Sequence, residues 1–339
     1  MLIGYSLSKL PLVSGYLLAS ILRYVIRRLL FMIPVFLGVA ILTFAVGNAA
    51  GDPITLIRVG LRNPSPVVLA ALRAYYHLDR PVYERFLLWL WEILHGNLGL
   101  SITGRPVAQQ IGAWALTTME LQIISLVLAV VLGIPIGVYS AKHQYTKRDY
   151  AITSVAIFGY SMPTFWLGIM LIILFSFNLG WLPSSGATGI SFLWWGNSVL
   201  DHLAHLILPV VVLTYVSLAT IVRLVRANML EVLRQDYILA ARASGLSEFT
   251  VTYRYALRNA ISPVITILGL SFGASLGGAP ATETTFTWPG LGYAFAQAAQ
   301  VLDIPLVQGI TVVITVMVLL ANLVTDLGYA VLDPRVRIE

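Results

Sequence analysis

The sequence contains no cysteine, and only 11% of its 339 residues are charged. The absence of cysteine excludes disulfides, thiolate metal sites and cysteine nucleophiles. Roughly a quarter of the residues of an ordinary soluble domain are charged, so the scarcity of charge argues against a soluble chain. Hydrophobic residues make up 58% of the sequence. This composition is typical of a protein embedded in a bilayer.

Basic residues outnumber acidic ones and give a formal charge of +6. They sit at the ends of apolar stretches and form no basic face interleaved with aromatic residues, which is the arrangement typical of nucleic-acid binding. We therefore predict no nucleic-acid partner.

Catalytic and nucleotide-binding motifs are also missing. The sequence has no GxxxxGK(S/T) phosphate-binding loop and no HExxH zinc motif, and the Gly159–Ser161 triplet is not a serine-hydrolase elbow. Of the five histidines, only His202 and His205 could share a helix face, and we interpret them as interfacial rather than metal-bound. We expect no catalytic residue, no metal site and no cofactor bound by this chain.

Stretches without Asp, Glu, Lys or Arg locate the membrane spans, because a spanning helix needs about 20 largely apolar residues. They predict an all-α integral membrane protein with six spans. The first span lies at 21–51, after an N-terminal extension at 1–20, and the others lie within a core at 114–338, at about 114–141, 151–178, 202–226, 259–282 and 304–331. After the third span, Trp181, Trp194 and Trp195 suit an interfacial aromatic belt.

Six spans place both termini on the same side of the membrane. With the N-terminus inside, every Lys and Arg outside the segment 52–113 falls on the cytoplasmic side, as the positive-inside rule requires. The termini and the polar loop 229–258 are therefore predicted to be cytoplasmic. A structureless loop as long as 52–113 would be unusual, so we expect a small folded extracytoplasmic cap, with helical signals at Asn63, Pro64 and Pro81.

Four charged residues lie close to predicted span ends. Glu120 could face the pathway or lie in the headgroup layer, and the second is favoured. At least one of Arg223 and Arg226 is interpreted as an arginine that reaches back to the inner interface. Asp326 lies near the inner surface, where an interfacial or tertiary partner of an arginine is expected rather than a proton carrier.

Small residues gather in two spans and favour close helix packing. In the second span these are Gly133 and Gly137, with Pro135 between them. The fifth span is predicted to pack on both sides, as at an interface between two permeases, because of Gly269, Ser271, Gly273, Ser275, Gly277 and Gly278.

A polar, helix-breaking patch interrupts the third span at membrane depth. It comprises Tyr160, Ser161, Met162 and Pro163. Non-helical backbone at that depth is tolerated only inside protein or beside a water-filled cavity. The patch is thus a candidate for a translocation path, although a proline kink that only shapes the bundle is an equal alternative.

The most distinctive stretch is the arginine-rich insert between the fourth and fifth spans. A first helical piece, Glu231 to Ala243, is predicted to stop at Gly245, and a second, Glu248 to Arg258, runs into the next span. Glycine just past a helix end reverses the chain without steric cost. Two short helices at such a turn would form a compact knob. The plainer interpretation is a solvated hairpin.

This insert resembles the EAA loop of ABC importer permeases, the element that sits in a groove of the ATPase subunit. The resemblance rests on Ala240, Ala241 and Gly245, followed by Tyr255, Leu257, Asn259 and Pro263. Leu239 stands where the loop's glutamate would be, and Arg258 where its proline would be. The longer strings RLVRANMLEVLRQDYILAARASGL and YALRNAISPVIT resemble the first permease subunit of the dipeptide/oligopeptide/nickel class of importers.

Further strings carry the same resemblance in the same order, over about residues 22–337. They are GDP at 51–53, LDRP at 78–81, GNLG at 96–99, GYSMPTFW in the third span, and a string opened by Glu283 that resembles the family's re-entrant outer loop and gate helix. Asn97 replaces the usual acid of the third string, and Ala50 the proline that usually precedes the first.

The resemblance implies the permease fold of type I ABC importers. It assigns ATPase coupling to Asp236, Tyr237, Ala240, Ala241, Arg242 and Gly245, and adds Glu283 to the candidate path. It also implies a second homologous permease, two cytoplasmic ATPase subunits that hold ATP and Mg, and an extracytoplasmic substrate-binding protein docked on the cap. The location would be the inner membrane, and the cargo, peptides or similar solutes, stays open.

Two other classes of function compete with this interpretation. An ion-coupled secondary transporter usually shows ionisable residues at mid-membrane and repeated halves, whereas here the charges sit at span ends and no repeat is evident. An intramembrane enzyme is disfavoured by the missing catalytic sets.

Overall fold

The computed structural model describes residues 11–51, 65–189 and 198–332, and this part of the chain is helical apart from its turns and one isolated bridge. Among the described residues, four helices are long and apolar enough to cross a membrane. They are α1 (Pro11–Ala49), α5 (Val107–Lys142), α8 (Ser198–Val232) and α15 (Ile304–Leu332). The expectation of an all-helical membrane protein is confirmed.

Two bent pairs of helices bring the number of candidate spans to as many as six. The first pair is α6 (Lys147–Ser161) with α7 (Thr164–Leu171) and the π-helical segment η2 (Ile172–Asn178), and it bends by 104°. The second joins the segment Glu248–Ala260 to α12 (Ser262–Ser275) at 45°. The predicted third span is therefore not one straight helix, because Pro163 has no N–H to continue the helix of α6.

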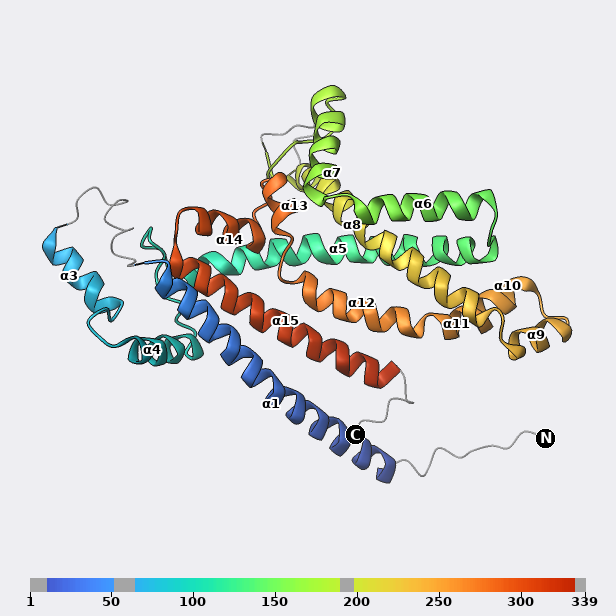
Figure 1. Cartoon of the computed structure of the whole chain (residues 1–339), viewed down its shortest axis with the longest axis horizontal. Helices are drawn as coiled ribbons and strands as arrows, with labels where there is room; N and C mark the ends of the chain where they lie inside the picture. Colours follow the sequence, from blue (N-terminus) through green and yellow to red (C-terminus); the bar gives the residue numbers. More distant parts are fainter. Residues whose placement is uncertain (1–10, 52–64, 190–197, 333–339) are drawn as a thin grey trace.

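The remaining helices are shorter. They are α3 (Pro66–Tyr75), α4 (Val82–Leu94), α9 (Asp236–Ala243), α10 (Glu248–Thr250), the π-helical η3 (Val251–Ala256), α11 (Leu257–Ala260), α13 (Pro280–Thr285) and α14 (Leu291–Gln300). In Figure 1 the long helices run along the longest axis, with α9 and α10 at one end and α3, α4 and α14 at the other. α7 projects away from the layer of long helices.

Glycines let α5 and α8 pack in direct contact. A Cβ on Gly133 would lie 2.7 Å from Ile221 Cγ2, and one on Gly137 would lie 2.7 Å from Val225 Cβ. These distances are shorter than any real Cβ contact, so only glycine fits. The predicted packing role of the small residues in the second span is confirmed.

The small residues of α12 face α15 of the same chain. A Cβ on Gly269 would collide with Thr325, and one on Gly273 with Asn322. The Thr325 hydroxyl also donates to the Gly269 carbonyl oxygen at 3.2 Å. One side of the helix is thus covered within the chain, and its use on a second side stays a prediction.

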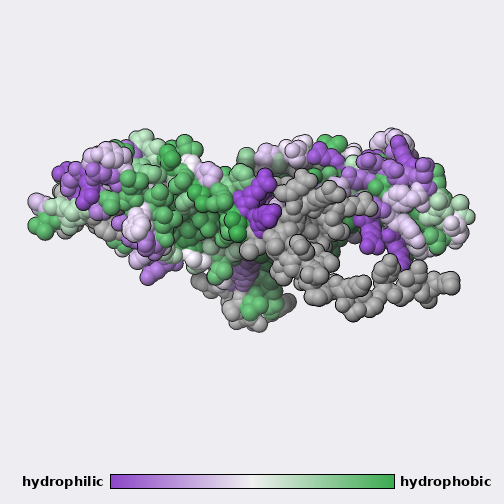
Figure 2. Space-filling view, turned by 90° about the horizontal axis from the view of Figure 1, so that it is seen from below, coloured by the Kyte–Doolittle hydropathy of each residue, from purple (hydrophilic) through white to green (hydrophobic). Residues whose placement is uncertain are grey.

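α1 lies at the edge of the bundle, against α15 (Figure 1). Only 6% of its most apolar stretch is buried. Arg28 Nη2 lies 2.5 Å from Asp326 Oδ2, which confirms the expected arginine partner of Asp326. Figure 2 shows apolar side chains to the left of the centre of the face on which α1 lies.

Several predicted boundaries differ from those of the structure. α1 continues without a break from the predicted extension at 11–20, and α5 begins at Val107 instead of 114, directly after Pro106. The fifth span ends at Ser275 instead of 282, because Gly278, with φ of +88°, and Pro280 follow. Other expectations lie outside the described residues: those for 1–10, Asp52, Pro53, Asn63, Pro64, Trp194, Trp195 and 333–339.

Candidate functional site

The predicted helix–turn–helix knob is present between α8 and α12. α9 ends at Ala243, and Gly245 takes a left-handed conformation with φ of +76°. The Gly245 N–H donates to the Arg242 carbonyl oxygen at 3.0 Å, and the Leu246 N–H to that of Ala241 at 3.4 Å. These bonds satisfy the last carbonyls of α9, so the predicted glycine turn is confirmed. The first helix of the knob starts at Asp236 rather than Glu231, since α8 itself continues to Val232.

Buried side chains join the knob to the bundle. Ile238 of α9 is fully buried and belongs to one hydrophobic cluster with Met229 of α8, Val138 of α5 and Val251 of η3. The resemblance assigned Ala241 to contact with the ATPase. In this structure, however, Ala241 is buried in the same cluster and packs α9 against the core. A knob packed into the core of two long helices moves with them as one body.

The outward face of the knob carries large apolar side chains among charged ones. Phe249 is 71% exposed, and Tyr237, Leu239 and Tyr253 are exposed as well. The rings of Phe249 and Tyr253 stack with centroids 4.7 Å apart. Large exposed apolar side chains that gather at one end of a molecule mark a protein interaction surface.

Polar contacts hold the shape of this face. Arg242 Nε donates to Glu248 Oε1 at 2.9 Å across the glycine turn. Asn259 Nδ2 donates to the Tyr237 hydroxyl at 2.9 Å, which ties α9 to α11. Among the predicted coupling residues, Asp236, Tyr237, Ala240, Arg242 and Gly245 are exposed. They lie together on the knob.

An ion pair that the sequence analysis missed joins α6 to α8 near the knob. Arg226 donates to both oxygens of Asp149, each at 2.7 Å, and the Asp149 side chain is 2% exposed. The Ser140 hydroxyl and the Tyr145 N–H also donate to this carboxylate. Arg226 is thus a tertiary partner and does not reach back to the interface. Thr146 is a residue type that favours a helix start, and its side chain accepts a hydrogen bond from the Asp149 N–H at the start of α6.

The predicted helix break lies at Met162, between α6 and α7. Tyr160 is 61% exposed, and the Arg223 guanidinium lies 5.3 Å from the centroid of its ring. Both residues line a hollow of about 140 Å³ between α6 and α8. Ser161 donates to the Ile157 carbonyl oxygen, and neither it nor Met162 nor Pro163 lines that hollow. The structure therefore brings Tyr160 and Arg223 together and leaves the rest of the patch at the hinge.

Glu283, assigned to the candidate path by the resemblance, is enclosed by protein in this structure. It is fully buried and accepts hydrogen bonds from the Tyr293 N–H at 2.9 Å, the Ala279 N–H at 3.2 Å and the Thr118 hydroxyl at 3.2 Å. A Cβ on Gly290 would lie 2.4 Å from its carboxylate. The carboxylate fixes the loop between α13 and α14 against α5 and is closed off from any open surface in this conformation, so a place for Glu283 on the path stays a prediction that this structure does not support. No periodicity in the sequence indicates such a contact.

Glu120 is paired and does not simply sit in a headgroup layer. Its Oε1 lies 2.8 Å from His202 Nε2, while His202 Nδ1 faces the Ala187 carbonyl oxygen. His205 is buried beside Asp201 of the same helix. The two histidines thus have different partners.

One literal match to the hydrolase pattern GxSxG, at Gly273–Gly277, lies at the end of α12. The elbow requires a strand that turns into a helix, whereas here the Ser275 hydroxyl donates to the Phe272 carbonyl oxygen within the helix. The match carries no catalytic meaning.

Comparison with known proteins agrees with these features. The model of the family described as binding-protein-dependent transport system inner membrane component matches residues 133–338. The oligopeptide transport system permease protein AppB of Bacillus subtilis is 42% identical over 92% of this chain and 98% of its own length. The dipeptide transport system permease protein DppB of Escherichia coli is 41% identical over 93% and 99%.

A solved structure is similar in fold. A chain of the methionine ABC transporter MetNI, in an inward-facing conformation, matches with a TM-score of 0.51 at 17% identity. The match covers 66% of this chain and 97% of that one.

Proposed function

The chain belongs to the family of binding-protein-dependent transport system inner membrane components, and from this membership we propose how its parts work. It is a permease subunit of an ABC importer, a multi-pass protein of the inner membrane that is not itself an enzyme. This membership favours an ABC importer over the ion-coupled transporter. Its named relatives carry oligopeptides and dipeptides, and we propose peptides as its cargo.

The observation that carries the proposal is the knob, whose outer face exposes large apolar side chains and whose inner face is packed into the bundle. A partner that binds Phe249, Tyr237 and Leu239 would move α9 together with α5 and α8 as a rigid body, because Ile238 packs α9 against both helices. Rigid-body motion is transmitted only through closely packed joints. We propose that two cytoplasmic ATPase subunits, which hold ATP and Mg, bind this face and drive the change between inward and outward states.

We propose that the chain bends at Met162 when the knob moves. α6 is tied to α8 by the Asp149–Arg226 pair at its inner end, while α7 and η2 turn away by 104° beyond the hinge. The hollow lined by Tyr160 and Arg223 lies on the knob side of the hinge. Tyr160 is thus the residue of the patch that we propose to line the path.

A homologous second permease is proposed to complete the pore, in a six-span arrangement with both termini cytoplasmic. An extracytoplasmic binding protein would deliver the peptide to the end that carries α3, α4 and α14.

Reconstitution tests the proposal. The chain is co-expressed with a homologous permease, the ATPase subunits and the binding protein of the same organism, and peptide uptake into liposomes is measured. Uptake is expected with the complete set and ATP, and none is expected from this chain alone under a proton or sodium gradient. Gradient-driven uptake by the chain alone would overturn the assignment in favour of a secondary transporter.

A further inference from the structure

α4 carries an apolar stripe that faces away from the rest of the described chain. Tyr83, Leu87, Trp91 and Leu94 follow a spacing of four, four and three residues, which places them on one side of a helix. Each is between 60% and 66% exposed. A water-facing cap helix would show polar residues there, so the helix has its apolar face outward.

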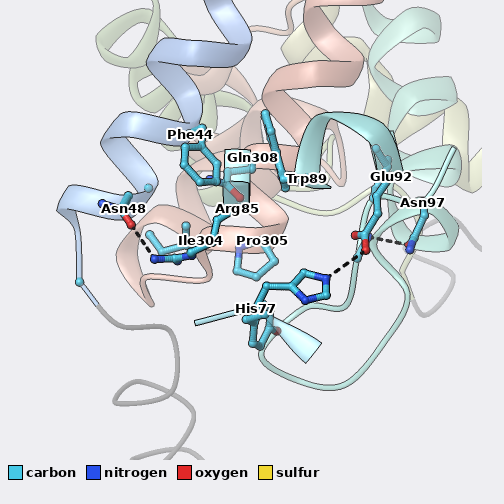
Figure 3. Close-up of a pocket in the computed structure, with 15 residues that line it drawn as sticks. Phe44, Asn48, His77, Arg85, Trp89, Glu92, Asn97, Ile304, Pro305 and Gln308 are labelled. Atoms are coloured by element: carbon cyan, nitrogen blue, oxygen red, sulfur yellow. Dashed lines mark hydrogen bonds and ion pairs between the residues drawn. The ribbon is translucent and has the colours of Figure 1, made fainter. Parts of the chain in front are cut away.

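The opposite face of α4 is held against the end of α1. The rings of Phe86 and Trp89 lie 5.4 Å and 5.5 Å from the ring of Phe44. Arg85 Nη1 donates to Asn48 Oδ1 at 3.1 Å. Figure 3 shows Arg85, Trp89 and Glu92 turned towards a pocket of about 100 Å³, with Phe44 and Asn48 across from them. These contacts fix the rotation of α4, so the direction of the stripe is set by packing.

The same contacts set the depth of α4. Asn48 lies in the last turn of α1, where the apolar run of this helix ends, and Ala49 is its last residue. In the last turns of α1, Ile41, Leu42 and Val46 are exposed, at 53% to 68%. Most of α1 is not covered by protein in the described chain, and the proposal made below takes this side of the bundle to face lipid. α4 is therefore attached at the level where hydrocarbon gives way to headgroups.

We propose that α4 is an interfacial helix that lies in the outer leaflet, with its stripe among phospholipid acyl chains. Tyr and Trp are enriched at the membrane interface, and an amphipathic helix buries its apolar face there by about 5–10 Å. The cap is then attached to the bilayer as well as to α1. The assignment of α4 to the outer leaflet rests on the orientation of the chain proposed above.

The absence of cysteine makes a direct test available. Spin labels are attached at L87C and L94C on the stripe, and at E92C as the control, because Glu92 lies on the opposite, pocket-facing side of α4 and its side chain is 41% exposed. The full complex is placed in phospholipid nanodiscs, and the collision rates of each label with oxygen and with a water-soluble nickel chelate are measured. At L87C and L94C the oxygen-to-nickel ratio is expected to be several-fold higher than at E92C.

Equal ratios at the three positions would overturn the proposal. So would labels at L87C and L94C that are exposed to nickel alone and become immobilised when the binding protein is added, because the stripe would then be a protein docking surface. If a cysteine variant fails to assemble, quenching of tryptophan fluorescence by brominated phospholipids, compared between the wild type and W91F, gives the same information. A loss of quenching in W91F is expected, and unchanged quenching counts against the idea. Neither readout requires transport, so a failure here leaves the import function untouched.

Discussion

Buried carboxylates in this protein hold elements together instead of reacting. Asp149 receives bonds from Arg226, Ser140 and the Tyr145 N–H, and Glu283 from two backbone N–H groups and Thr118. A buried charge with every oxygen engaged is stable in place, whereas removal of one partner leaves an uncompensated charge. Each carboxylate therefore fixes the position of a chain reversal, at 143–146 for Asp149 and at 286–290 for Glu283.

D149A is expected to destabilise the protein by about 3 kcal/mol, because it leaves the partly buried Arg226 without its partner. Thermal unfolding of the purified complex measures the loss. E248A serves as the control, since the Arg242–Glu248 pair is exposed and contributes about 1 kcal/mol or less. Equal effects of the two variants would show that the Asp149 pair is no more than a surface contact.

At the scale of elements, glycines decide which helices touch and where the chain turns. Gly137 allows α5 and α8 to meet, whereas Gly245 has open space around it and is required only for its left-handed backbone. The first role concerns stability and the second concerns the shape of the knob. The two can be separated by mutation.

G137L is expected to destabilise the α5–α8 pair by about 1–3 kcal/mol, because overpacking forces the helices apart. G112L, on the exposed side of the same helix with nothing within 4 Å, is the matched control. The melting temperature of the complex should fall for G137L and stay near the wild-type value for G112L. A fall of the same size in both would contradict direct α5–α8 contact at Gly137.

G245L is expected to leave the complex assembled and to reduce ATP-driven uptake strongly. A leucine in the left-handed region costs about 1–2 kcal/mol, which distorts the turn beneath the proposed ATPase surface without entering the core. G245N should keep most of the activity, since asparagine tolerates this conformation. If G245L retained full substrate-stimulated ATP hydrolysis and uptake, the knob would not be the coupling element.

At the scale of the whole molecule, the structure has two chemically different ends joined by an apolar middle. The knob lies at one end, and α3 and α4 lie at the other (Figure 1). The basic residues outside 52–113 belong to the knob side under the predicted orientation. The orientation therefore decides at once which end of the molecule is cytoplasmic and which is extracytoplasmic.

Thiol labelling of intact cells tests this orientation, because the chain has no native cysteine. V67C, on the exposed side of α3, should react with a membrane-impermeant maleimide added outside. S244C, on the knob, should react only after the cells are permeabilised. The reverse pattern would invert the topology and remove the knob from any cytoplasmic ATPase.

The sequence by itself determined the features that depend on local composition. Apolar stretches without charge gave the membrane class, glycine and proline gave the turn at Gly245 and the break before Pro163, and the strings around the knob gave the family. Each of these signals is contained in one short stretch of neighbouring residues. They could be interpreted without knowing which helices meet.

Only the tertiary structure decided which distant residues share an environment. Ala241 turns out to be buried, Glu283 fixes a loop, Arg226 pairs with Asp149, and the apolar face of α4 points outward. In a chain that is apolar almost everywhere, periodicity does not distinguish a face that meets lipid from a face that meets another helix. That distinction depends on which side chains fit together in space, and the fit exists only once the helices are packed.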